Sequence, residues 1–90
     1  MGLLKSLFQT QKLNGDPLQQ ALAQALLDSV EKNGGTGMAT REVFNILHSN
    51  GWSRSEQGNR LIHAASMTKV WRADLFPQVK ELGESLYKSL

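Results

Sequence analysis

The sequence predicts an all-α fold, a single small domain of four to five short helices. Apolar residues recur at spacings of three and four over most of the chain, which is the period of an amphipathic helix. No segment alternates apolar and polar residues over the length of a strand. Asn-Gly pairs at 14–15, 33–34 and 50–51 divide the chain into helix-sized segments, because asparagine and glycine tolerate the positive φ angles of turns and helix ends.

The strongest helical pattern spans residues 17–33. Asp16 is a good N-cap for this helix, and Pro17 suits its first position, where the missing N–H has no partner to lose. The helix is expected to end at Asn33-Gly34. Its apolar face is expected to comprise Leu18, Ala21, Leu22, Ala25, Leu26, Ser29 and Val30.

A shorter pattern precedes this helix at residues 2–12. Its apolar side chains form one stripe, which suits a short amphipathic helix. We therefore expect a single helical domain at 1–90, in which residues 1–15 form a loosely docked N-terminal helix. The stripe consists of Leu3, Leu4, Leu7 and Phe8.

Three further helices are expected at 40–50, 54–70 and 74–89. Asp74 is expected to cap the last of them, with Pro77 tolerated in its first turn. The apolar faces expected for these helices are, in chain order, Val43, Phe44, Ile46 and Leu47; Gly58, Leu61, Ile62 and Ala65; and Leu75, Phe76, Val79, Leu82, Leu86 and Leu90.

The composition narrows the possible functions. A chain of 90 residues is long enough for one domain. It contains no cysteine, which excludes disulfides, thiolate metal sites and a cysteine nucleophile and agrees with a cytoplasmic location. The net charge of +2 permits contact with nucleic acid without requiring it. No apolar run reaches the roughly 20 residues that a membrane span needs.

The segment EKNGGTGMATRE lies between two expected helices. Its outline resembles an EF-hand, whose loop binds calcium through oxygen ligands at positions one, three and five and a glutamate at position twelve. Glu31, Asn33 and Glu42 occupy positions one, three and twelve. Gly35 supplies no side-chain oxygen at position five, and Thr36 replaces the glycine of position six. The resemblance implies a degenerate EF-hand-like helix-loop-helix without strong calcium binding, and the other interpretation is a plain glycine-rich linker.

The expected helices at 40–50 and 54–70, joined by a short glycine-containing turn, have the outline of a helix-turn-helix motif. Residues 53–60 would then enter the major groove, because this stretch is rich in side chains that bond phosphates and base edges. Gly58 would let the two helices approach closely. The candidate nucleic-acid-binding residues are Arg41, Arg54, Ser55, Gln57, Asn59, Arg60, Lys69 and Arg72.

An enzymatic function is not expected. His48 and His63 belong to different expected helices, and no acidic residue is spaced so that it would orient either ring. Two histidines without a third ligand make a poor zinc site. The sequence contains neither a nucleophile-elbow motif nor a phosphate-binding glycine motif. We therefore expect no cofactor and no small-molecule substrate.

The last expected helix has a wider apolar face than one small core requires. Beside its leucine-rich stripe, Phe76, Gly83 and Tyr87 form a second stripe. Self-association or a partner helix could bury this surface, and so could the N-terminal helix. Aromatic residues dominate the energies of interfaces. The candidate partner-binding residues are therefore Trp71, Leu75, Phe76 and Tyr87.

Three functional interpretations follow from these patterns. The leading one is a small non-enzymatic helical interaction module that binds a protein partner or itself. The alternative is a helix-turn-helix-like protein that binds nucleic acid through residues 53–60. The third is the degenerate EF-hand.

Overall fold

The computed structural model describes residues 15–34 and 38–90. Within these residues the chain forms four α-helices and no strand, so the predicted all-α fold is confirmed. The expected helix at 2–12 lies outside the described residues, as does the docking of the N-terminal residues. The helices are α2 (Pro17–Asn33), α3 (Arg41–His48), α4 (Arg54–Trp71) and α5 (Phe76–Ser89).

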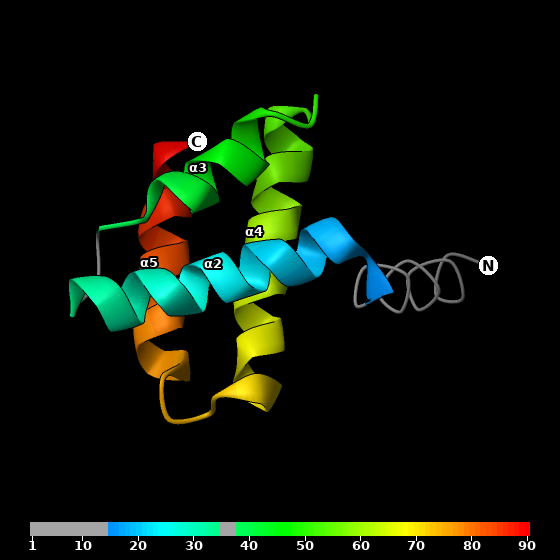
Figure 1. Cartoon of the computed structure of the whole chain (residues 1–90). Coiled ribbons are helices and arrows are strands. Elements are labelled where there is room, and N and C mark those ends of the chain that lie inside the picture. The colour runs from blue at the N-terminus through cyan, green and yellow to red at the C-terminus, as the bar shows by residue number, and fades with distance from the viewer. Residues whose placement is uncertain (1–14, 35–37) are drawn as a thin grey trace.

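The four helices pack around an antiparallel hairpin. Figure 1 shows α4 and α5 side by side and running in opposite directions, joined by the short connection 72–75. α2 crosses one face of this hairpin and contacts both of its helices. α3 lies mainly against α2. The helices expected to form a helix-turn-helix pair, α3 and α4, therefore make few contacts with each other, since each has a different main partner.

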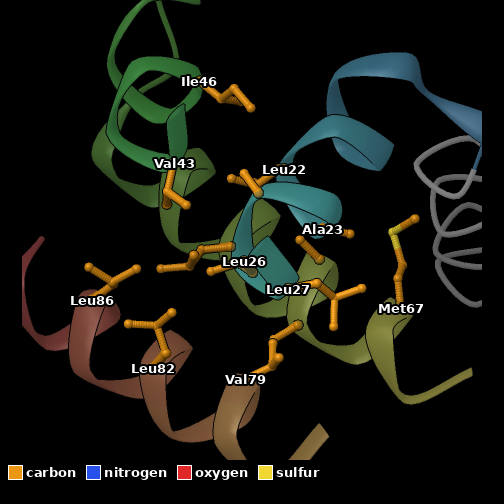
Figure 2. Packing of buried hydrophobic residues seen from close by; sticks show 14 of the residues in the cluster. Leu22, Ala23, Leu26, Leu27, Val43, Ile46, Met67, Val79, Leu82 and Leu86 are labelled. Carbon is orange, nitrogen blue, oxygen red and sulfur yellow. The ribbon is translucent and has the colours of Figure 1, made fainter. Parts of the chain in front are cut away.

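The core lies where α2 meets the hairpin and α3 (Figure 2). Leu22 and Leu26 of α2 are fully buried, together with Val43 of α3 and Leu61 of α4. Val79 and Leu82 of α5 are fully buried in the same cluster. Burial of one such side chain contributes roughly 1.5–3 kcal/mol relative to leaving it in water. This cluster is therefore the main source of stability for the fold.

Local signals at the ends of α2 are confirmed. The Asp16 carboxylate accepts a hydrogen bond from the N–H of Leu18 at 2.8 Å, as an N-cap does. Gly34 ends the helix with φ +65°, and its N–H bonds the carbonyl of Val30. This left-handed conformation suits glycine because it has no Cβ.

Two other helix ends differ from the expectation. α3 ends at His48 rather than at residue 50, because the side-chain amide of Asn50 turns back and donates to the carbonyl of Ile46 at 2.6 Å. Asp74 does not cap α5. Its carboxylate accepts hydrogen bonds from Arg72, and Leu75 occupies the N-cap position without a side-chain cap.

The buried faces also differ in part from those expected. Leu18 is 40% exposed, whereas Ala23 and Leu27 are buried. Because α2 contacts three other helices, its buried surface is wider than one apolar stripe and includes residues outside that stripe. Phe44 is 42% exposed, since α3 buries only the side that meets α2. Ile62 is 41% exposed on α4 and lies in a surface groove described below.

Candidate protein-interaction surface

Two glycines let α4 and α5 approach closely. A Cβ on Gly58 would lie 2.8 Å from the Tyr87 ring, and a Cβ on Gly83 would lie 3.4 Å from the Cβ of Ala65. The first distance is shorter than real Cβ contacts, so glycine is required for this Tyr87 position. Gly58 was expected to bring α4 against the preceding helix, and that expectation is wrong, because the residue faces α5.

A groove of about 120 Å³ runs between α4 and α5 where α2 does not cover them. We call this surface the outer face. Its walls are partly apolar, with Ile62 exposed on α4 and Phe76 half-buried on α5. An apolar groove between two helices that no other described helix covers is suited to accept a further helix. The residues that line it are Ile62, Ala65, Ser66, Phe76, Lys80 and Glu84.

A second depression of about 380 Å³ borders the outer face, and the two share Ser66. We call it the flank groove. Val70 is 86% exposed and Trp71 is 41% exposed, so the apolar surface continues along α4 towards its end. The residues that line the flank groove are Gln20, His63, Ser66, Met67, Val70 and Trp71.

His63 adds no fixed charge to the flank groove at neutral pH. The ring is half-buried on α4, and burial lowers the pKa of His63 below its ordinary value of 6.5. Burial disfavours the charged form of an imidazole because it removes water from the cation. The flank groove therefore presents a neutral surface at pH 7.

The charges of the outer face belong to few side chains. The ammonium of Lys69 lies 5.7 Å from the centroid of the Phe76 ring, within the range of a cation–π contact. Lys80 and Glu84 lie on α5, after Phe76, and are one helical turn apart. Neither takes part in any of the ion pairs found in the described part of the chain. Both remain available to a partner.

The partner-binding residues predicted from the sequence divide between these surfaces. Phe76 lies in the outer face, and Trp71 lies in the flank groove. Tyr87 is 52% exposed against Gly58. Leu75 instead packs against the core.

Sequence reasoning missed Ile62 and Val70 as surface residues. Ile62 was assigned to the core, and Val70 was assigned to no face. The spacing of eight residues between them, which places both on one stripe of a helix, was the signal that could have paired them.

The polar start of α4 has its own groove, of about 410 Å³. Arg54, Ser55 and Asn59 are exposed there, as the nucleic-acid interpretation expects, and Tyr87 and Leu90 of α5 form the other wall. Arg41 is also exposed but begins a different helix, α3.

Arg60 and Gln57 are engaged within the protein. The Arg60 guanidinium pairs with Asp16 at 3.3 Å and lies over the Trp52 ring at 4.3 Å. Burial alone would raise the pKa of Asp16, but hydrogen bonds from Leu18 and Arg60 outweigh it and lower that pKa. Gln57 donates its side-chain amide to the carbonyl of Trp52 at 3.1 Å. Both side chains therefore join α4 to neighbouring segments.

Arg72 is engaged in the same way. Its guanidinium pairs with Glu31 at 3.1 Å and with Asp74 at 3.0 Å. The hydrogen bond and charge of Arg72 lower the pKa of Asp74, and Asp74 raises the pKa of Arg72. The positive charge of Arg72 is thus balanced within the protein.

Two of the three candidate calcium ligands are engaged with other groups of the protein. Glu31 pairs with Arg72, and the side-chain amide of Asn33 donates to the carbonyl of Met38 at 2.7 Å. Glu42 lies in the first turn of α3. Across residues 15–34 and 38–90, no three acidic, histidine or cysteine side chains form a metal-binding group. Positions five and six of the loop lie outside the described residues.

None of the helices in the described part of the chain combines the length and the apolar character required to cross a bilayer.

Comparisons with known proteins add no functional information. The chain matches no protein-family model, no curated protein and no solved structure.

Proposed function

We propose that this protein is a non-enzymatic helical interaction module. It binds a helix of a protein partner across the outer face and the flank groove. The observation that carries the proposal is exposed apolar surface in two adjoining grooves: Ile62 and Phe76 line the outer face, and Val70 and Trp71 line the flank groove. An amphipathic helix of a partner can lay its apolar face into a hydrophobic groove of this kind.

The residue types that line the two grooves favour a protein ligand. Aromatic side chains and arginine supply most of the binding energy in interfaces, and Trp71 and Phe76 lie at the edges of adjoining grooves. The neutral His63 and the apolar Val70 favour an apolar partner surface over a polyanion. The proposal retains the cytoplasmic location expected for a chain without cysteine.

Nucleic-acid binding is the second candidate. It is supported by the exposed groove of Arg54, Ser55 and Asn59 at the start of α4. It is weakened by Arg60 and Arg72, because each is paired with carboxylates of the protein itself. Nucleic-acid affinity comes largely from positive charges that neutralise phosphates. Protein binding is therefore better supported than nucleic-acid binding.

Photo-crosslinking in cells tests the proposal. A short-range crosslinking amino acid is placed at Ser66, which both grooves share, and at Asn45, an exposed control position on α3. We expect one defined protein adduct from position 66 and none from position 45. Ile62→Glu should abolish that adduct without lowering the helical content, because the side chain is already 41% exposed. Equal labelling at both positions, or an adduct unaffected by Ile62→Glu, would contradict the proposed function.

A further inference from the structure

The exposed stripe of α4 is symmetric about its centre. Ile62, Ser66 and Val70 follow at four-residue intervals, so they lie along one side of the helix. The two ends are exposed β-branched apolar side chains, and the centre is a small polar one. A second α4 running in the opposite direction would place Ile62 against Val70 and Ser66 against Ser66. The stripe is thus complementary to an antiparallel copy of itself.

The exposed stripe of α5 has the same kind of symmetry. Lys80 lies two residues before Leu82 and Glu84 two residues after it, so Leu82 marks the centre of this pair. Among the described residues, neither Lys80 nor Glu84 forms an ion pair. An antiparallel copy of α5 would place each Lys80 against the Glu84 of the other helix. Phe76, which also lines the outer face, lies one turn before Lys80 on α5. One antiparallel arrangement of two α5 helices therefore forms two Lys80–Glu84 ion pairs.

The two centres of symmetry lie at the same height in the hairpin. Ala65 and Gly83 are level, because a Cβ on the glycine would lie 3.4 Å from the Cβ of the alanine. The helices are antiparallel, so the next residue on α4 and the preceding one on α5, Ser66 and Leu82, are level as well. A single twofold axis at this height satisfies both stripes.

We infer that the partner of the outer face is a second copy of this chain. The inference rests on the proposed function, and it names the partner. Two hairpins pack face to face about the twofold axis, with α4 antiparallel to α4 and α5 antiparallel to α5 of the other protomer. Such an interface is isologous, since each residue contact occurs twice, and a symmetric dimer is the commonest soluble oligomer. Ser66 lies on the axis, and the Lys80–Glu84 pairs lie on both sides of it.

A single introduced cysteine tests the axis directly, because the natural chain contains none. Ser66→Cys should give a covalent dimer under mild oxidation, and the disulfide should form at concentrations at which the protein sediments as a dimer. Asn45→Cys, on the exposed side of α3, is the matched control and should remain monomeric on a non-reducing gel. Crosslinking that is equal at the two positions, or stronger at position 45, would overturn the arrangement.

Charge reversal tests the self-complementarity. Lys80→Glu and Glu84→Lys each place like charges opposite one another at both pairs, and each should weaken dimerisation about tenfold in sedimentation experiments, as expected for two exposed pairs. A mixture of the two variants restores opposite charges at both pairs. It should therefore form mixed dimers with an affinity near that of the unmodified chain. Unchanged affinity in both single variants, or no gain on mixing, would overturn the inference.

The outcomes also separate the inference from the proposed function. A monomer at all concentrations without Ser66→Cys dimers, combined with a position-66 adduct to a different protein, would refute the second copy and keep the interaction module. A monomer without any position-66 adduct would refute both.

Discussion

Asp16 joins two kinds of stabilisation in one side chain. Its Oδ1 accepts the N–H of Leu18 and caps α2, and its Oδ2 pairs with the half-buried Arg60 at 3.3 Å. We predict that Asp16→Ala lowers the free energy of unfolding by about 1–2 kcal/mol, the usual cost of a lost N-cap. Asp16→Asn keeps the capping oxygen and removes only the charge, so its effect should be smaller. Urea denaturation followed by circular dichroism measures both, and equal losses in the two variants would contradict this account.

His63 makes stability depend on pH. Its pKa is lowered by burial below 6.5, so between the lowered pKa and 6.5 the unfolded chain binds a proton that the folded chain does not. The free energy of unfolding must therefore fall as the pH drops below 6.5 through the lowered pKa, and His63 contributes nothing to this slope above 6.5. We predict that His63→Gln reduces the loss of stability between pH 7 and pH 5. Thermal melts of both proteins across this range check the prediction, and identical slopes would refute it.

Ser29 connects two helices. Its hydroxyl is fully buried, lies 2.8 Å from the carbonyl of Ala25 and accepts the N–H of Thr40 at 2.9 Å, just before α3 begins. Thr40 makes no side-chain cap bond to the first turn of α3, and Ser29 satisfies the backbone N–H of Thr40 itself. The helix-period pattern identified Ser29 only as part of a buried face. The structure adds that this face ends in a hydrogen bond that sets where α3 starts.

We predict that Ser29→Ala lowers the free energy of unfolding by about 1–3 kcal/mol, because the N–H of the half-buried Thr40 then lacks its partner. Ser89→Ala is the matched control. That hydroxyl also bonds a carbonyl four residues earlier, at 3.2 Å, but it is exposed. The control should change stability by less than about 0.5 kcal/mol. Similar losses for both serines in chemical denaturation would show that the link to Thr40 is unimportant.

Across the whole molecule, the sequence predicted the contacts between residues close together in the chain better than those between distant residues. The Asp16 cap and the Gly34 end of α2 involve partners two to four residues away, and both are confirmed. Arg60 and Asp16 are 44 residues apart, and no local pattern joins them. The error at Asp74 has a different cause: its competing partner, Arg72, is only two residues away, and the guanidinium takes the carboxylate that would have capped α5.

The candidate surface was predictable only in part for a related reason. Apolar periodicity tells which side of a helix is apolar, but not whether another helix covers it. Ile62 satisfies the apolar pattern of α4 and yet lies 41% exposed, because α2 crosses the opposite part of the hairpin. Phe76 and Tyr87 were identified because the apolar face of the last helix was too wide for one core. Placing these residues together required the packing of α4 against α5.

The central claim is that the outer face binds protein and that nucleic acid is not the ligand. Two-dimensional amide NMR of the full chain tests it most directly, first as a concentration series and then in titrations with a random-sequence DNA duplex at low and high salt. The account predicts concentration-dependent shifts at Ile62, Ser66, Val70, Lys80 and Glu84, and no shifts on adding DNA. Salt-sensitive shifts confined to residues 53–60 on adding DNA, with no dependence on protein concentration, would contradict it, because phosphate contacts weaken steeply with salt.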